Sequence, residues 1–408
     1  MAGWLLASIA LITAQPDAAE TPGRPVAEAV EAVQSQDYAR ALRLSEDLAA
    51  VGNPDAQYLL GHLYANGFGV QKDVPRAVQL YVAAASAGQT NAQFALGELA
   101  YTGEGAKQDW ARAAEWYNLA AAKGHMLAKT RLGYMYAEGQ SVPQDPQRAA
   151  NMFEEAAKAG VPAAQYHLAL LYLDGTGRKK SFGEAAKWFE AAARQGDADS
   201  MYNLALMIES GRLGETRPLE EAASWMRKAA EAGVLPAKTS MGLMAYNGRG
   251  IERSDADALK WFRVSAQEGD PEGMFLYAVA LSEGLGGEPD FRTALKWAES
   301  AVAASEGEAP AIQRERKGLR DQLLYVIEEQ KRLQQHKALV KAEQPSAAMR
   351  AAQNVSLIPS PAAVPQRQSP PPELSAPVSE ATQQVAGQLL EAKPSTNGDV
   401  RRTRGLRR

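Results

Sequence analysis

The sequence predicts an all-α protein, a right-handed α/α solenoid of stacked helix pairs, and an internal repeat is the main reason. Apolar residues within the repeat follow helical spacing rather than the alternation of strands. Each unit also alternates large and small apolar positions, which lets one helix pair pack closely on the next. Seven units run from Asn53 to Ser305. Their turn glycines recur every 36 residues, with one interval of 37, at Gly88, Gly124, Gly160, Gly196, Gly233 and Gly269.

The composition excludes several classes of function. The 408 residues include 44 Lys and Arg against 48 Asp and Glu, and a net charge of −4 argues against a basic nucleic-acid-binding protein. The absence of cysteine excludes disulfide frameworks, zinc fingers, iron–sulfur clusters and a cysteine nucleophile. Because there are also only four histidines, we expect no metal site and no cofactor. The sequence contains no apolar run of about 18 residues, so a multi-spanning membrane protein is excluded.

The N-terminus has the features of an export signal. Gly3 to Ala14 forms an apolar, uncharged run that is too short to span a membrane but suits a signal-peptide core. Ile12 and Ala14 fit the −3 and −1 positions of a cleavage site, although no Lys or Arg precedes the core. We therefore predict a signal peptide over residues 1–14, a linker over 15–23 and a periplasmic or secreted protein. An uncleaved anchor and a buried N-terminus are the alternatives.

A capping helix pair is expected over residues 24–52, and seven helix pairs over 53–305. The first helix of each pair ends at a loop glycine such as Gly67. The second helix begins at a residue that is Asp or Ser in six of the seven units, because these side chains cap a helix N-terminus. This column is Asp73, Asp109, Asp145, Ser181, Pro218, Ser254 and Asp290. Farther along the second helix we expect a buried aromatic pair, as in Trp116-Tyr117, Trp188-Phe189 and Trp261-Phe262.

The C-terminal part divides into a helix and a tail. A charged helix is expected over residues 306–344, with an apolar stripe that caps the last repeat and, as an alternative, forms a coiled coil with a partner. The stripe is Leu319, Leu323, Val326, Ile327 and Leu333. Residues 345–408 are rich in Pro and lack aromatic residues, which is typical of a disordered tail. Five of its last eight residues are Arg, so contact with an anionic surface is the alternative to a solvated tail.

The repeat resembles the Sel1-like repeat family, a relative of the tetratricopeptide repeats. The residues that carry the resemblance in the first unit are Ala56-Gln57-Tyr58-Leu59-Leu60-Gly61, Tyr64, Gly67, Gly69, Val70, Asp73, Ala77, Tyr81, Ala84-Ala85 and Gly88. The resemblance implies an adaptor that assembles protein complexes, often in bacterial envelopes. Cysteine-rich relatives are associated with penicillin binding or β-lactamase activity, but they carry a disulfide in each repeat and this chain has no cysteine.

Catalytic motifs are absent from the sequence. It contains no S-x-x-K, G-x-S-x-G, H-E-x-x-H or G-x-x-x-x-G-K-[ST] motif. Loops such as Gly67-Phe68-Gly69 lack the third glycine and the preceding strand of a phosphate-binding loop. His62, His125 and His167 occupy different columns of the repeat, so we expect partly exposed polar residues rather than metal ligands. We predict that the protein is not an enzyme.

The candidate binding surface consists of the columns that vary along the first helices. A column here is the set of equivalent positions in the seven repeats, numbered by its residue in the first repeat. Columns with the same residue type in every repeat are expected to pack in the core. The residue type in columns 59 and 62 changes from repeat to repeat. Because first helices line the concave side of helix-pair solenoids, we expect these columns to form a groove. Arg131, Tyr134 and His167 lie in adjacent units and are expected to be exposed on this face. The predicted groove residues are Leu59, His62, Glu98, Arg131, Tyr134, His167 and Asn203.

These observations favour an exported, non-enzymatic scaffold that binds a segment of another envelope protein. Two alternatives stay open. One is a hydrolase or penicillin-binding protein that acts on cell-wall glycopeptide, as implied by the cysteine-rich relatives. The other is a periplasmic regulator of a sensor kinase.

Overall fold

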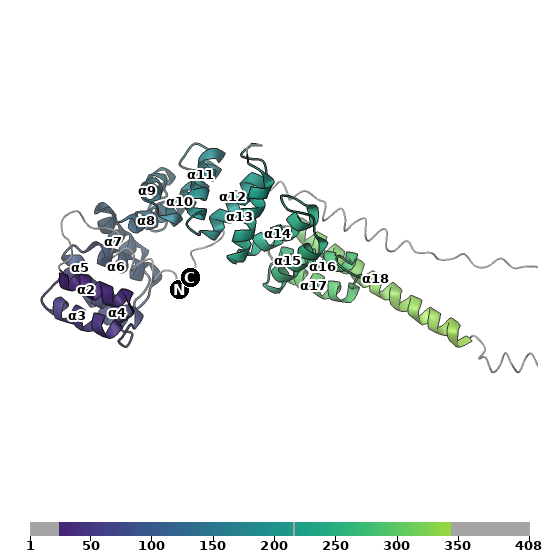
Figure 1. The fold of residues 1–408 in the computed structure, drawn as a ribbon, viewed down its shortest axis with the longest axis horizontal. Coiled ribbons are helices and arrows are strands. Elements are labelled where there is room, and N and C mark those ends of the chain that lie inside the picture. Colours follow the sequence, from purple (N-terminus) through teal and green to yellow (C-terminus); the bar gives the residue numbers. More distant parts are fainter. Residues whose placement is uncertain (1–23, 215–216, 344–408) are drawn as a thin grey trace, which may run out of the picture. The chain divides into compact units, whose positions relative to one another are not determined.

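The structure is a computed structural model that describes residues 24–214 and 217–343, so the predicted signal peptide, linker and tail lie outside the described residues. Seventeen helices and no strand occur in these two ranges. The chain forms two compact units, which meet in sequence between Asp197 and Ala198. Each unit is a stack of helix pairs, which confirms the predicted all-α solenoid class (Figure 1).

The first unit holds the capping pair and four repeats. Its helices are α2 (Arg24–Gln34), α3 (Tyr38–Ala50), α4 (Pro54–Asn66), α5 (Val74–Ser86), α6 (Thr90–Thr102), α7 (Trp110–Ala122), α8 (Met126–Glu138), α9 (Pro146–Lys158), α10 (Pro162–Asp174) and α11 (Phe182–Ala193). Each helix packs against the next one in the chain, and α2 also contacts α4.

The second unit holds three repeats and the C-terminal helix. Its helices are α12 (Ala198–Glu209), α13 (Leu219–Glu231), α14 (Leu235–Asn247), α15 (Asp255–Gln267), α16 (Pro271–Glu283), α17 (Phe291–Ala304) and α18 (Pro310–Glu343). Within this unit too, each helix packs against its successor.

Short polar side chains start the helices as the sequence predicts. The side chains of Asp73, Asp109, Asp145, Ser181, Ser254 and Asp290 each accept a hydrogen bond from the backbone N–H three residues later. Pro218 has no such side-chain bond, and α13 begins without it. The first helices have caps of their own, which the sequence analysis missed. Asn53, Gln89, His125 and Asp270 provide them.

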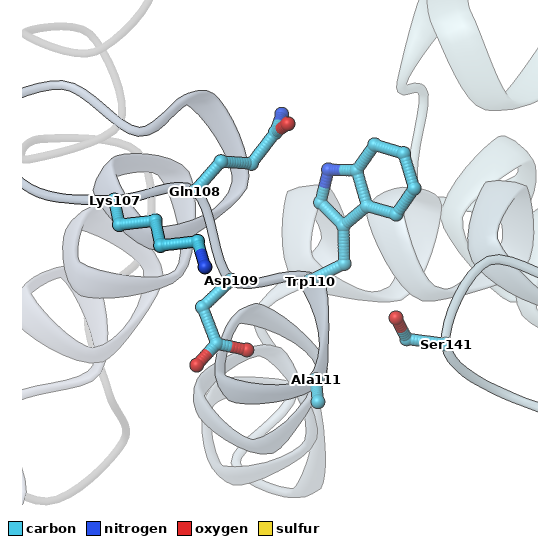
Figure 2. A pocket seen from close by; sticks show the side chains of 6 residues that line it. All are labelled: Lys107, Gln108, Asp109, Trp110, Ala111 and Ser141. Atoms are coloured by element: carbon cyan, nitrogen blue, oxygen red, sulfur yellow. The ribbon is translucent and has the colours of Figure 1, made fainter.

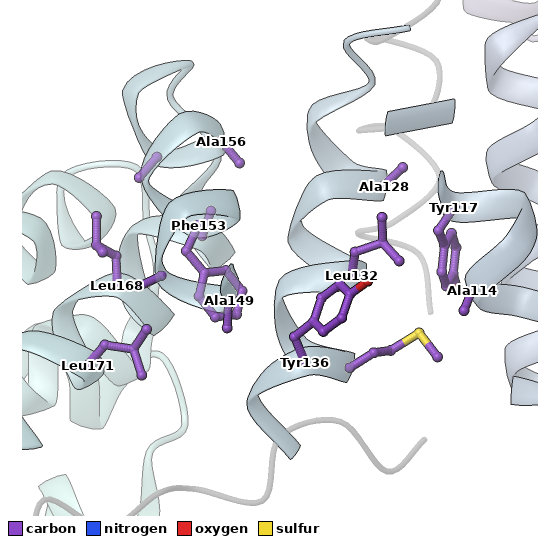
Figure 3. Close-up of a cluster of buried hydrophobic side chains, with 14 of the residues drawn as sticks. Ala114, Tyr117, Ala128, Leu132, Tyr136, Ala149, Phe153, Ala156, Leu168 and Leu171 are labelled. Carbon is purple, nitrogen blue, oxygen red and sulfur yellow. The ribbon is translucent and has the colours of Figure 1, made fainter. Parts of the chain in front are cut away.

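Close approach of large and small residues holds each helix pair together. A Cβ atom built on Gly97 would lie 2.5 Å from the Tyr117 ring, and one on Gly133 would lie 2.8 Å from the Phe153 ring. These distances leave no room for a methyl group. Figure 3 shows Phe153 among Ala149, Ala156 and Leu168 in the same apolar cluster.

The predicted burial of both members of the aromatic pair is wrong for the tryptophans. Tyr117, Phe189 and Phe262 are fully buried, whereas Trp116, Trp188 and Trp261 are only half-buried. The first member of each pair lies one position earlier on the helix. It is therefore turned by about 100° from the face that packs on the first helix.

Helix α18 caps the last repeat with its first half. Leu319, Leu323 and Val326 are buried, and the nearly buried Arg316 forms ion pairs with Glu272 and Glu308 at N–O distances of 3.1 and 2.6 Å. Leu333 belongs to the predicted stripe but is 53% exposed, because the helix continues past the side chains that cover its earlier turns. In the described ranges no helix is both long enough and apolar enough to cross a membrane.

Candidate functional site

The predicted groove residues divide into a buried set and a half-buried set. Leu59 and His62 are buried, and Leu59 belongs to the apolar cluster formed with α2 and α3. Asn203 lies in the second unit and is 1% exposed, and its amide donates a hydrogen bond to the Asp199 carbonyl of its own helix. The prediction that these three residues line an open groove is therefore wrong. Side chains of the capping pair cover Leu59.

The other four predicted residues come together in the first unit. Arg131 on α8 forms two parallel hydrogen bonds with Glu98 on α6: Nε and one Nη donate to the two carboxylate oxygens, at 2.7 Å each. Tyr117 on α7 donates its hydroxyl proton to the same carboxylate at 2.5 Å. The Arg131 guanidinium also lies over the Tyr101 ring, 5.7 Å from its centroid. A two-pronged pair of this kind is strong and directional.

This network corrects the prediction that Arg131, Tyr134 and His167 are freely exposed. The Arg131 side chain is only 12% exposed, and Tyr134 and His167 are half-buried. The His167 ring stacks on Phe153 at a centroid distance of 5.1 Å and contacts Tyr134 at 5.9 Å. Each of the three side chains is therefore partly packed between neighbouring repeats and partly exposed at the surface.

Burial and charge change the ionisation of the site. Burial is the main cause that raises the pKa of Tyr117, and the adjacent Glu98 carboxylate raises it further. Burial also raises the pKa of Tyr101. For Arg131, burial is the largest single influence and lowers the pKa, but the charge and hydrogen bonds of Glu98, together with Tyr117 and Tyr101, raise the pKa overall. The site thus contains the Arg131–Glu98 ion pair. Next to it lie Tyr101 and Tyr117, whose hydroxyl groups keep their protons at neutral pH.

Comparison with known proteins identifies the repeat. The Sel1 repeat family model matches residues 54–89, 90–125, 127–161, 162–197, 198–234, 236–270 and 271–305. These matches cover more than half of the chain. The chain belongs to the Sel1 repeat family. Sel1 repeat proteins are typically scaffolds for protein–protein interaction.

Two solved structures are similar to this chain, and the first agrees with the family assignment. A Sel1 repeat protein from Oxalobacter formigenes is 30% identical, with a TM-score of 0.55, and the match covers 60% of this chain and 99% of that one. A protective antigen of uropathogenic Escherichia coli with the SLR fold is 23% identical over 85% of this chain and 90% of that one, with a TM-score of 0.44. The comparison with curated protein sequences gives no significant match.

Two histidines of this Sel1 repeat protein are structural, not partly exposed as predicted. His125 is buried and caps α8, where Nδ1 accepts a hydrogen bond from the Ala128 N–H at 3.1 Å. His62 on α4 is buried, and its ring lies 6.1 Å from that of the loop residue Phe68, centroid to centroid. Burial lowers its pKa to about 4, and Nε2 has no hydrogen-bond partner among the described residues. Those residues also contain no group of three or more His, Cys, Asp or Glu that could hold a metal ion.

Tyr101 and Tyr117 belong to the site, but the sequence analysis did not select them. The sequence predicts a packing role for Tyr117, because the equivalent position is aromatic in several repeats. Its hydroxyl group is the available signal: the equivalent residues Phe153, Phe189 and Phe262 have none, and Tyr81 has one. A buried hydroxyl requires a partner, and Glu98 is the carboxylate within reach.

Proposed function

We propose that this protein is an exported, non-enzymatic scaffold that binds a segment of another protein along the first helices of its second, third and fourth repeats. The observation that carries the proposal is the cluster of Glu98, Arg131, Tyr134 and His167. The sequence varies in these columns, yet the side chains meet in one partly buried surface across three repeats. Family membership supports the general class of function, and the cluster supports its location.

The chemistry of the cluster suits recognition of a peptide. Arg and Tyr are the residue types most often found as anchors at protein interfaces. The ion pair and the stacked rings hold them in fixed rotamers, so binding immobilises few side chains that are free beforehand. A rigid, amphipathic surface of this kind favours an extended segment with both polar and apolar side chains.

Neutralising the ion pair should weaken partner binding with little change in folding. In the variant Glu98→Gln and Arg131→Gln, the two amides can still hydrogen-bond to each other, so no buried charge is left unpaired. We expect the affinity for the partner to fall at least tenfold, about 1.4 kcal/mol. Proximity labelling in the native cell would identify the partner, and titration of the purified partner would measure the change.

A matched control removes an ion pair elsewhere in the same repeats. Lys129 on α8 bonds Glu155 on α9 at 2.5 Å, away from the candidate surface. The variant Lys129→Gln, Glu155→Gln should bind the partner normally. If the control variant loses binding and the cluster variant binds normally, the partner binds on the face of Lys129 and Glu155, and the proposed location is contradicted. Normal binding in both variants would direct attention to residues 345–408.

Export is tested by the N-terminus of the native protein. If residues 1–14 are a signal peptide, the mature chain begins near Gln15 and fractionates with the periplasm or the medium. Mass spectrometry of the purified native protein would show this directly, and an intact Met1 would contradict it. Turnover of nitrocefin or covalent labelling by a fluorescent penicillin would contradict the non-enzymatic assignment.

A further inference from the structure

Four aromatic side chains follow one another across the second, third and fourth repeats of the first unit. The rings of Trp110 and Tyr101 contact each other at a centroid distance of 6.4 Å, and those of Tyr134 and His167 do so at 5.9 Å. Tyr134 lies close enough to Tyr101 to raise the pKa of that phenol. We call these four residues the aromatic row.

An open pocket lies at the Trp110 end of the aromatic row. It has a volume of about 500 Å³ and is lined by Lys107, Gln108, Asp109, Trp110, Ala111 and Ser141 (Figure 2). Trp110 is 38% exposed. Among the described residues, neither the Trp110 indole N–H nor the Ser141 hydroxyl group has a hydrogen-bond partner. This end of the row therefore offers hydrogen-bond donors beside an aromatic surface, which suits an apolar ligand with free carbonyl groups.

The charges along the aromatic row nearly cancel. The charged side chains that act on Tyr101 or line the pocket are two positive and three negative ones, namely Arg131, Lys107, Glu98, Glu138 and Asp109. Arg131 and Glu98 are bonded to each other, and Asp109 accepts the capping hydrogen bond of α7. The small negative excess favours an occupant that is neutral or carries one positive charge.

A proline-rich segment of the same chain has this chemistry. Residues 359–372, PSPAAVPQRQSPPP, lie outside the described residues and contain six prolines and one charged residue, Arg367. Such a sequence favours the polyproline II helix, which has three residues per turn and leaves its carbonyl groups free of internal hydrogen bonds. Pro359, Ala362 and Pro365 are three residues apart, so this helix would present them on one side.

We propose that residues 359–372 bind the aromatic row of their own chain as a polyproline II helix. Proline rings pack on Trp110 and Tyr101, and backbone carbonyl groups accept hydrogen bonds from the Trp110 indole and the Ser141 hydroxyl group. Grooves lined by aromatic residues commonly recognise this helix, because it loses little conformational entropy on binding. Tethering through residues 344–358 raises the effective concentration of the segment, so a modest affinity is sufficient.

The contact regulates access to the candidate binding cluster. Tyr134 and His167 belong to both surfaces, so a bound segment competes with the partner of the proposed function. The binding of the segment itself does not depend on that function and is tested without the partner.

The test is titration of a fluorescein-labelled synthetic peptide of residues 359–372 into the purified full chain. An open variant, in which the six prolines of this segment are replaced by Ser, should bind the peptide at least tenfold more tightly than the wild type. In the open variant, Trp110→Ala should weaken peptide binding at least tenfold, and Trp110→Phe, which lacks the indole N–H, several-fold. Because Trp110 is exposed, thermal melts of these variants should stay close to the wild type.

The chain provides a matched control, because Phe182 occupies the column of Trp110 two repeats later. In the open variant, Phe182→Ala should leave peptide binding unchanged. A peptide that fails to bind the open variant, or binds it equally well after Trp110→Ala, would overturn the proposal. Equal affinity of the wild type and the open variant would overturn it too, as would a wild-type dimer that the open variant does not form. None of these outcomes decides the scaffold function, which titration of the native partner tests separately.

Discussion

Phe153→Ala should lower the free energy of unfolding of the first unit by about 3–5 kcal/mol, the usual cost of truncating a buried aromatic residue. The Phe153 side chain is 1% exposed, packs against Gly133 and supports the stacked ring of His167. Because helix pairs in a stack contact only their neighbours, hydrogen-exchange protection should fall most in α8, α9 and α10. Chemical denaturation and native-state exchange measure both effects. A uniform loss of protection along the first unit would contradict the local picture.

A second substitution tests the contact itself. Gly133→Ala alone should destabilise by about 1–3 kcal/mol, because the new methyl group meets the Phe153 ring. In the Phe153→Ala background the ring is gone and the methyl group enters the vacated space. The loss of unfolding free energy in the double variant should therefore be smaller than the sum of the losses in the two single variants. Strict additivity would show that the two residues do not pack on each other.

The buried His62 should make the stability of the first unit depend on pH. Its pKa is lowered to about 4 because burial disfavours the charged ring, whereas an unfolded chain has the ordinary value of about 6.5. Between these values the unfolded state binds the extra proton. Above pH 6.5 the residue has no effect, and as the pH falls to 4 it removes about 3 kcal/mol of stability.

His62→Leu separates this effect from the titration of carboxylates. Leu already occupies the same column at positions 170, 206 and 243, so the substitution suits the fold. It also removes a buried nitrogen that lacks a hydrogen-bond partner. The variant should match or exceed the wild type at pH 7 and surpass it by about 3 kcal/mol at pH 4. Parallel stability curves of the two proteins from pH 7 to pH 4 would assign the acid sensitivity to other groups.

The fold could be predicted from the sequence because the signals that specify it are local and repeated. Asp73 and Asp109 cap the second helices through their own backbone neighbours, and Gly67 and Gly103 end the first helices in left-handed conformations. Each of these features depends on residues a few positions apart. Because the pattern occurs in seven repeats, its recurring positions can be distinguished from chance similarity.

The candidate site was harder to predict because exposure depends on contacts between repeats. Columns 59 and 62 vary along the chain, but variation does not distinguish a free side chain from one with a specific partner. Arg131 and Glu98 are 33 residues apart, and only the stacking of α6 and α8 brings them together. Leu59 is covered because the capping pair adds one more layer. These facts follow from the assembled stack and not from one repeat.

Contacts between successive helices have a consequence for the order in which the protein can form. Each helix packs on its immediate predecessor within its unit. The chain loops that must close during folding are therefore short, and the entropic cost of closing them is small. A repeat can reach its native packing as soon as the preceding pair is present. A chain that is synthesised from its N-terminus can thus fold progressively, before its last residues are made.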